Sequence, residues 1–387
     1  MRQISILFTC SIALIFFYSC SNHSTDDSPD YIQSLENVTV HEIESQPELS
    51  IKLTQLTAFG NSEDVPFGRI SYVDIDDSGN VYISEGSRGN EAVYVFDSEG
   101  NYLNKIGRSG EGPGEFRSIY DMKVFNDKLL VLDGNLLRIQ FFSTDDHSLI
   151  DEASLNPSQW DRSGEQSMTF PENIFVLNDS TLLASFNHLT FDIDTKSYYH
   201  LDLDGNVISD RILTHNFIKH LKDPSSSHAF YDPFGGRGLI GLSTDNEIYS
   251  VWSDKMLFKV HDADGTYLRA FYHPYSNSSI SRDEALNFHE SEHFKSALRH
   301  HGIPDYWRAF EHLILDSENR LWVSTISENQ EIYNWWVMDS QGIVLAKKEL
   351  PRTIEIKKVK NDIMYSLISD EETGIQQVVS YEIEWES

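Results

Sequence analysis

A short pattern recurs six times along the chain and limits its fold more than any other feature. Each copy is a polar stretch rich in Asp, Asn and Ser that runs directly into an apolar, β-rich segment. Residues 76–80, for example, precede Val81-Tyr82-Ile83. The six segments begin at Val81, Leu129, Leu182, Ile248, Leu321 and Ile363, with spacings of 48, 53, 66, 73 and 42 residues. A propeller blade takes roughly 40–50 residues, so the longer spacings predict insertions.

A second pattern is an apolar run that ends in Asp-x-x-Gly and leads into another apolar run. In such a turn the Asp side chain caps its own backbone, and the Gly accepts a positive φ. The copies lie at residues 97–100, 202–205, 262–265 and 339–342, with a degenerate copy at 143–147. Each falls between two copies of the first pattern, which gives two hairpins and four strands per repeat. The sequence therefore predicts an all-β fold, a six-bladed β-propeller.

The two ends of the repeat region complement each other. The last repeat has only three strands and ends near residues 378–385, whereas the apolar run at 49–56 precedes the first repeat. Pairing this N-terminal strand with the last blade would remove two open sheet edges and close the ring. We therefore expect one monomeric domain over residues 36–387, with an insertion at about 276–308 between blades 4 and 5.

Charge composition excludes two classes of partner. The chain has 30 Lys plus Arg against 61 Asp plus Glu, a formal net charge of −31. No basic surplus is present to neutralise the phosphates of a nucleic acid. The same balance argues against docking on anionic lipid through a polybasic patch.

The N-terminal segment has the features of an export signal. Arg2 precedes an almost wholly apolar stretch at residues 4–18, which is too short for a comfortable membrane span. The following Ser19-Cys20 resembles a bacterial lipoprotein box, which implies cleavage after residue 19 and acylation of Cys20. An uncleaved anchor, or a plain signal with an accidental cysteine, are the alternatives. Residues 20–35 are expected to form a flexible polar tether.

Lipidation would fix both the cysteine chemistry and the location. Cys10 leaves with the signal and Cys20 carries lipid, so the mature domain would have no disulfide. The predicted location is the cell envelope, on the outer membrane, facing the periplasm or the exterior. Only the lipid anchor would touch the membrane.

The segment that runs from Glu99-Gly100-Asn101 into Gly107–Phe116 is the most specific in the chain. Its Gly-x-Gly-Pro-Gly-Glu-Phe stretch resembles the 6-bladed beta-propeller lipoproteins of Bacteroidetes-like bacteria, relatives of NHL-repeat propellers. The resemblance covers roughly residues 36–387. It implies a fold and a location much more than an activity.

Loop lengths indicate which face of the ring carries function. Turns between the first and second strands, and between the third and fourth, are short and share one face. The long connections fall on the opposite face, at residues 84–92, 107–118, 156–172, 185–198, 213–237 and 272–308. Long loops on a rigid scaffold commonly carry binding residues. We therefore expect a small ligand or a cell-envelope protein to bind this long-loop face without catalysis.

Candidate binding residues on that face include several arginines, which can grip a carboxylate or phosphate with two hydrogen bonds. The alternative for each is a structural ion pair. The glycines around Pro113 either carry Glu115 and Phe116 toward the channel or serve packing between blades. The candidates are Arg88, Arg108, Glu111, Glu115, Phe116, Arg117, His188, Arg237 and His273.

Metal-dependent chemistry is the rival interpretation, as an extracytoplasmic hydrolase or lyase. His289-Glu290-Ser291-Glu292-His293 is a formal H-E-x-x-H, and Glu311 downstream could supply a third zinc ligand. Residues 74–85 nearly satisfy a calcium-binding EF-hand loop, but their flanks are strand-like and they coincide with the repeated turn. The resemblance to six-bladed propellers also implies calcium-dependent lactonases among the relatives. We expect no cofactor, with calcium or zinc as alternatives, and a scaffold for an outer-membrane assembly as a third possibility.

The insertion is favoured as a polar helix without metal. Residues 281–301 have a helical pattern that Ser281 can cap and that Gly302 and Pro304 can end. We expect this helix to cap the channel mouth. The residues expected to pack it down are Phe288, Phe294, Leu298, Tyr306, Trp307 and Phe310.

Overall fold

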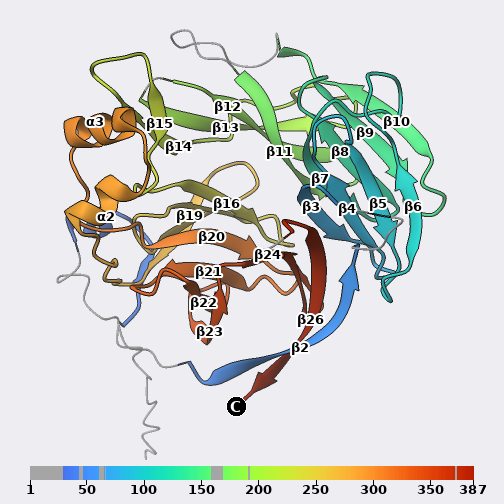
Figure 1. Cartoon of the computed structure of the whole chain (residues 1–387). Helices are drawn as coiled ribbons and strands as arrows, with labels where there is room; N and C mark the ends of the chain where they lie inside the picture. Colours follow the sequence, from blue (N-terminus) through green and yellow to red (C-terminus); the bar gives the residue numbers. More distant parts are fainter. Residues whose placement is uncertain are drawn as a thin grey trace, which may run out of the picture.

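The strands form six blades around a ring, as predicted (Figure 1). The computed structural model describes residues 29–42, 47–60, 65, 67–157, 169–190, 192–370 and 373–387. Blade 1 consists of β3 (Ile70–Ile75), β4 (Val81–Glu85), β5 (Ala92–Phe96) and β6 (Tyr102–Ile106). Blade 2 consists of β7 (Ile119–Phe125), β8 (Lys128–Asp133), β9 (Arg138–Ser143) and β10 (Leu149–Ser154). Blade 3 consists of β11 (Thr169–Asn178), β12 (Thr181–His188), β13 (Ile193–Asp202), β14 (Leu213–Lys222) and β15 (Ala229–Tyr231).

The second half of the ring follows the same plan. Blade 4 consists of β16 (Gly238–Leu242), β17 (Ile248–Trp252), β18 (Leu257–His261) and β19 (Tyr267–Tyr272). Blade 5 consists of β20 (Phe310–Leu315), β21 (Leu321–Ile326), β22 (Ile332–Met338) and β23 (Val344–Pro351). Blade 6 consists of β24 (Ile354–Lys360), β25 (Ile363–Ser369) and β26 (Gln376–Glu386).

The N-terminal strand closes the ring as the sequence predicts. Strand β2 (Leu49–Phe59) pairs antiparallel with β26 from Ser50 opposite Glu386 to Phe59 opposite Val378. Its first residues, Leu49 and Ser50, also pair in parallel with β23 of blade 5. The missing outer strand of blade 6 thus comes from the opposite end of the chain (Figure 1).

The segment before this strand contains two elements that the sequence analysis did not predict. Strand β1 (Val38–Val40) adds in parallel to β19 at the outer edge of blade 4. Helix α1 (Asp30–Gln33) buries Ile32 completely, although residues 20–35 were expected to be a tether. The folded part therefore begins before residue 36.

The repeated hairpin turns have the expected geometry. In each of six turns one aspartate oxygen accepts hydrogen bonds from the backbone N–H groups two and four residues later, at 2.8–3.0 Å. These aspartates are Asp76, Asp97, Asp202, Asp262, Asp316 and Asp339. The third residue after five of them is a glycine with φ between 83° and 88°, and Asn319 takes that place after Asp316 with φ 61°. Because residues 76–80 are such a turn between two strands, residues 74–85 do not form an EF-hand.

Apolar packing lies between neighbouring blades. Each of the six junctions has its own cluster of buried side chains, for example Val95 of blade 1 with Val131 of blade 2, and Phe59 of blade 6 with Val81 of blade 1. Because every blade is held on both sides, closure of the ring by β2 completes the last junction.

The insertion between blades 4 and 5 differs from the expectation in two ways. It forms two helices, α2 (Arg282–Asn287) and α3 (Glu292–His301), in place of one helix over residues 281–301. Ser281 does cap α2 through a capping box, and α3 ends at Gly302. The helices lie at the rim of the ring and not over its centre, because α3 packs on β14 and β15 (Figure 1).

The packing of the insertion follows the apolar stripe of α3. Phe294 and Leu298 are buried in one cluster with Leu221 of β14, Phe234 and Trp307. Phe310 belongs instead to the junction of blades 4 and 5. Tyr306, which was also expected to pack, is 60% exposed. Phe288 is 52% exposed, although its ring contacts Phe234 and Trp307.

Candidate functional site

Antiparallel order within each blade separates two faces of the ring. Short turns join the first strand to the second and the third to the fourth at one end, which we call the turn face. The other connections emerge at the opposite end, the long-loop face. They include residues 107–118 between β6 and β7 and residues 273–309 between β19 and β20. The long connections predicted at 107–118 and 272–308 are therefore observed. By contrast, residues 185–198 lie mostly in β12 and β13, residues 213–222 form β14, and the turn face has a long connection of its own at residues 203–212. Most of the segment 156–172 lies outside the described residues.

The glycine-rich loop at 107–118 folds tightly around one aromatic ring. Phe116 is fully buried and packs on Phe142 at the junction of blades 1 and 2. Gly107 has φ 72°, and a Cβ there would lie 2.3 Å from the Phe116 ring. A side chain at this position is excluded both by the backbone conformation and by the ring. Phe116 therefore serves packing between blades, which is one of the two roles that the sequence left open.

Blade 2 holds the loop through two buried polar side chains that the sequence analysis missed. Arg138 donates to the carbonyl oxygens of Gly112 and Glu115, each at 2.8 Å. Gln140 donates to the Glu115 carbonyl at 2.9 Å and accepts from the Gly114 N–H at 2.6 Å. Both residues sit in β9 with little exposure. The loop is thus fixed to the scaffold on one side and presents its other side to solvent.

Two ion pairs order the charged residues of this loop. Arg108 contacts Glu115 at 2.7 Å, and Arg117 contacts Glu111 at 2.7 Å. The backbone N–H of Gly112, with Arg108, lowers the pKa of Glu115. Both arginines are largely exposed, so these pairs contribute little to stability. Their main effect is to limit the positions of the two guanidinium groups.

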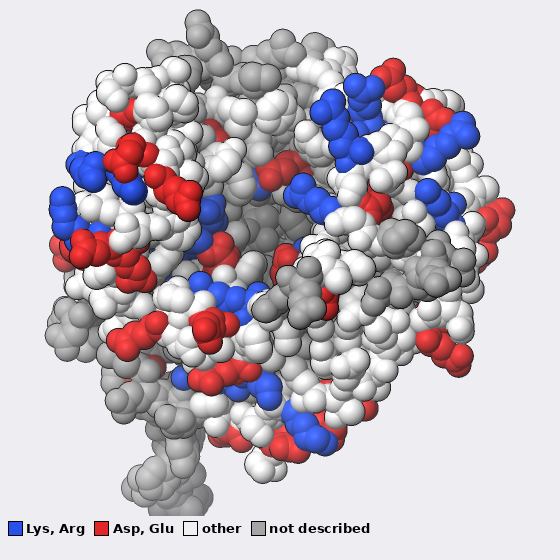
Figure 2. All heavy atoms as spheres, in the orientation of Figure 1, with Lys and Arg blue, Asp and Glu red and all other residues white. Residues whose placement is uncertain are grey.

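A groove of about 570 Å³ opens beside this loop on the long-loop face. Arg88, from the β4–β5 connection, and Arg117 line it together with Ser118 and Asn135. Arg88 is exposed and makes no ion pair or hydrogen bond within the described part of the chain. Lys and Arg side chains gather on the surface over the blades coloured blue-green in Figure 1 (Figure 2). Two of the predicted residues, Arg88 and Arg117, therefore line one groove, and Arg108 and Glu111 lie on the loop beside it.

The other three candidate residues lie elsewhere. Arg237 precedes β16 and is 3.6 Å from Glu311, and burial together with the nearby Arg308 lowers its pKa. His188 is the last residue of β12. His273 follows the outer strand of blade 4, is buried, and bonds the Gly342 carbonyl at 2.8 Å. Burial, with the stacked His41, lowers the pKa of His273 to about 4.

The central channel contains charges that are paired across and within blades. Lys358 of blade 6 contacts Asp74 of blade 1 at 2.9 Å, and Lys123 contacts Asp121 at 2.9 Å. Burial opposes the charge on Asp74, but the ammonium groups of Lys358 and Lys123 outweigh it and lower the pKa. Figure 2 shows the surface hollowed near the centre of the ring, with charges of both signs around it. The channel is polar, but its described charges are largely satisfied by one another.

The residues of the alternative zinc site do not come together. His289 lies between the two helices and its Nδ1 accepts from the Ser291 N–H at 3.0 Å. His293, on α3, contacts Asp223 at 2.6 Å, whereas Glu311 lies in β20 and is held by Arg308. Within the ranges that the structure describes, no three His, Cys, Asp or Glu residues are placed to hold a metal ion. The H-E-x-x-H match therefore fails because a break between the helices separates its two histidines.

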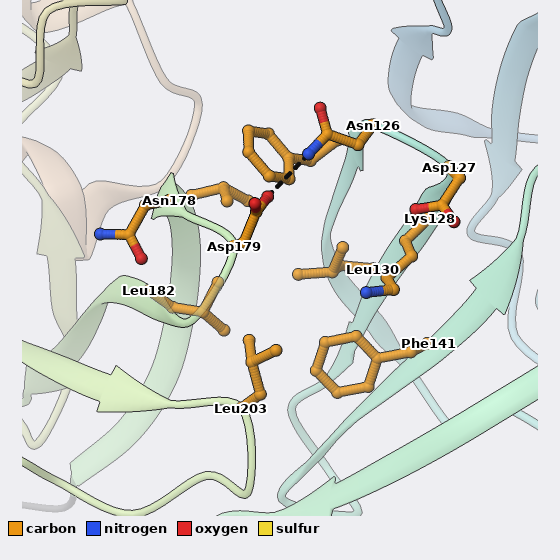
Figure 3. Close-up of a pocket in the computed structure, with 11 residues that line it drawn as sticks. Asn126, Asp127, Lys128, Leu130, Phe141, Asn178, Asp179, Leu182 and Leu203 are labelled. Atoms are coloured by element: carbon orange, nitrogen blue, oxygen red, sulfur yellow. Dashed lines mark hydrogen bonds between the residues drawn. The ribbon is translucent and has the colours of Figure 1, made fainter.

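The turn face also has hollows, although they are smaller. One of about 290 Å³ lies between blades 2 and 3, where Asn126 donates to Asp179 at 2.7 Å across the junction. Figure 3 shows this bond above Leu130, Phe141 and Leu182, which belong to the apolar cluster of that junction. This hollow is the unfilled end of a packing interface, and the long-loop groove remains the better candidate for a charged ligand.

Cys20, the signal and most of the predicted tether lie outside the described residues. Among the helices that the structure does describe, none combines the length and apolar character needed to cross a membrane.

Comparison with known proteins identifies the fold. A family model described as 6-bladed beta-propeller matches residues 22–268. A protein of Bacteroides fragilis described as exported is 13% identical, with 90% of this chain and 99% of that chain covered and a TM-score of 0.54. A protein of Bacteroides vulgatus is 12% identical, with 87% and 99% covered and a TM-score of 0.54. At these identities the likeness concerns the fold alone. No curated protein matches the sequence.

Proposed function

We propose that this chain, which belongs to the 6-bladed beta-propeller family, is an exported protein. It would bind an anionic ligand without catalysis. The ligand would occupy the groove between blades 1 and 2 on the long-loop face. The observation that carries this proposal is Arg88, an exposed guanidinium without a protein partner that lines a groove of about 570 Å³.

Position at a groove distinguishes this arginine, because Arg282 and Arg299 are also exposed and have no ion pair or side-chain hydrogen bond among the described residues. The protein carries 61 acidic against 30 basic residues, so an exposed arginine has many carboxylates available for pairing. Arg108 and Arg117 on the same surface do pair with neighbouring glutamates. An unpaired guanidinium beside them offers its donors to a carboxylate or phosphate of a ligand.

The surrounding groove suits a small ligand. Its volume lies within the usual range for small-molecule sites, roughly 300–1,000 Å³. Ser118 and Asn135 add neutral polar groups beside the two lining arginines, and the one lining carboxylate, Glu91, accepts a hydrogen bond from the Gly89 N–H at 3.0 Å. Arg138 and Gln140 hold the loop that forms one wall, so that little ordering is needed on binding.

The test is calorimetric titration of the purified soluble domain with citrate, pyrophosphate and trigalacturonate at low salt. We expect at least one probe to bind, and Arg88→Ala to weaken it by about tenfold, the effect of losing one charge-assisted contact. Arg282→Ala is the matched control, because Arg282 is also exposed but lies on α2 of the insertion. Absence of binding by all three probes, or equal losses in both variants, would refute the proposal.

Export and lipid anchoring complete the proposed role. Support comes from the N-terminal signal with its Cys20, and the similar B. fragilis protein is described as exported. Metabolic labelling with palmitate should acylate the protein but not Cys20→Ala. Label retained by the variant would show that Cys20 is not the anchor.

A further inference from the structure

A second groove on the long-loop face lies at blade 4, beside the insertion. It consists of two hollows of about 420 and 500 Å³, which share Asp254, Lys255, Asn277 and Tyr306 as lining residues. Asp254 and Lys255 lie in the β17–β18 connection, and the other two lie on either side of the helices. The insertion therefore builds one wall of a continuous groove against the propeller.

Two hydrogen-bond acceptors in this groove, on Asn277 and Asp254, are held in place by the protein but receive no hydrogen bond from the part of it that the structure describes. Both donors of the Asn277 amide are used on backbone carbonyls, those of Asp254 at 3.0 Å and Trp307 at 2.8 Å. This fixes the orientation of the amide and leaves its Oδ1 without a partner among the described residues. Asp254 Oδ2 accepts from the Trp252 indole at 3.1 Å, and its Oδ1 is likewise left without one.

Trp307 gives the groove part of an apolar wall. Its side chain lines the inner hollow and is only 7% exposed. Its indole nitrogen has no hydrogen-bond partner in the described structure, but it is closed off from solvent, so a ligand in the groove does not reach it.

Aromatic rings form the rest of the surface. Tyr306 is 60% exposed at the boundary between the two hollows, although the sequence predicted that it would pack the insertion down. Tyr31 of α1 lines the outer hollow and carries the Lys255 ammonium 3.7 Å from its ring centre. The exposed ring of Tyr306 leaves apolar surface in contact with water. A ligand with a flat apolar face could stack on the ring and remove that surface from water.

From this arrangement we propose that the groove binds a neutral oligosaccharide, with Tyr306 stacking on a sugar ring and Asp254 and Asn277 accepting hydrogen bonds from its hydroxyls. A sugar ring combines an apolar C–H face with hydroxyls that both donate and accept. Those are the two kinds of surface that the groove offers.

The charges at the groove favour a neutral ligand over a charged one. Carboxylates of Asp232, Asp254 and Asp305 stand with the ammonium groups of Lys219 and Lys255 along its walls. A multiply charged ligand would meet like charges wherever it lies. A wholly apolar ligand would leave the acceptors of Asp254 and Asn277 desolvated without compensation.

The test is a binding screen of the purified domain against neutral gluco-, manno-, xylo- and chito-oligosaccharides of two to six units. Calorimetry and Trp fluorescence would then follow any binder in variants. We expect Tyr306→Ala to weaken binding by about fivefold or more through lost stacking. Asp254→Asn, which preserves shape, should weaken it by about tenfold through the lost charge-assisted bond. Tyr102→Ala is the matched control, because Tyr102 is 46% exposed on blade 1.

The result of this test does not depend on whether the proposed anion site between blades 1 and 2 exists. Loss in Tyr306→Ala and Asp254→Asn with retention in Tyr102→Ala and Arg88→Ala supports it, whether or not any anion binds. Failure of every oligosaccharide in the screen, or binding that Tyr306→Ala leaves unchanged, overturns it. Binding lost in Arg88→Ala alone would assign the sugar to the groove of blades 1 and 2 and also overturn it.

Discussion

Replacement of Asp316 by alanine should destabilise the protein far more than the same change at Asp339, although both cap hairpin turns of blade 5. Each aspartate accepts two backbone N–H bonds at 2.8–3.0 Å. Asp316 is fully buried and also accepts from Arg320 Nε at 2.6 Å and from the Trp322 indole at 3.0 Å. The comparison therefore isolates the two additional contacts within one blade.

The magnitude follows from the groups left behind. Loss of the turn bonds alone resembles loss of a helix N-cap, about 1 kcal/mol, and this is the expectation for Asp339→Ala. In Asp316→Ala the buried Trp322 indole N–H loses its acceptor, which costs about 1–3 kcal/mol. Arg320 loses one carboxylate but keeps Glu318 and Asp362, so its share is smaller than for a wholly orphaned charge. The total for Asp316→Ala is about 3–5 kcal/mol.

Guanidinium unfolding followed by far-ultraviolet circular dichroism measures both variants without relying on Trp322 fluorescence. Asp316→Asn serves as a third variant, because it retains shape and an acceptor but removes the charge, and it should fall between the other two. Equal m-values would show that the variants share one unfolding reaction. If Asp316→Ala and Asp339→Ala lost stability equally, within about 1 kcal/mol, the argument that burial amplifies the repeated turn would be wrong.

Three further predictions concern groups at other junctions. His273 has a pKa lowered to about 4 by burial, so the unfolded chain binds more protons than the folded chain between about pH 6.5 and 4. Stability should therefore fall as the pH drops through that window, by at most about 3 kcal/mol, and pH-dependent denaturation of His273→Asn should show a shallower fall. Gly107→Ala should lower the free energy of unfolding by about 2 kcal/mol or more, through the clash with Phe116 and backbone strain. Gly89→Ala should lose only the strain contribution, because Gly89 has φ 88° and no atom lies within 4 Å of the added Cβ. Similar thermal midpoints for the two variants would contradict this prediction. Lys358→Met should lower the free energy of unfolding by about 3 kcal/mol because Asp74 loses its nearest cation. The difference in stability between this variant and the wild type should shrink as the pH is lowered far enough to protonate Asp74.

Much of the fold can be predicted from this sequence because each hairpin encodes itself locally. An aspartate with a glycine three residues later specifies one turn whatever surrounds it, and Asp97 and Asp262 form the same bonds although they lie in different blades. Ring closure is also visible, because a strand-like N-terminal run and an incomplete last repeat leave complementary edges. The failures concern segments outside the repeat. Strand β1 and helix α1 are too short to carry a pattern, and their positions depend on the outer edge of blade 4.

The candidate sites are harder to predict because their residues meet only after the ring has closed. Arg88 and Arg117 are brought to one groove by the packing of blade 1 on blade 2, and Phe116 is one of the residues buried in that packing. In the sequence nothing distinguishes Arg138 from any other polar residue of a strand. In the structure it holds the glycine-rich loop that connects blade 1 to blade 2.

The insertion shows the same limit more sharply. Its sequence has one amphipathic pattern and, in or beside it, five aromatic residues and Leu298. The simplest expectation is that all six side chains pack beneath one helix. In the structure the helical segment is interrupted at residues 288–291, and α3 packs on β14. Phe294 and Leu298 then supply the buried apolar contacts of the insertion. Tyr306 is then left in the open beside Asn277 and Trp307. An aromatic residue that packing no longer needs, next to polar groups whose bonds are incomplete, is better evidence for a ligand than any motif in the sequence.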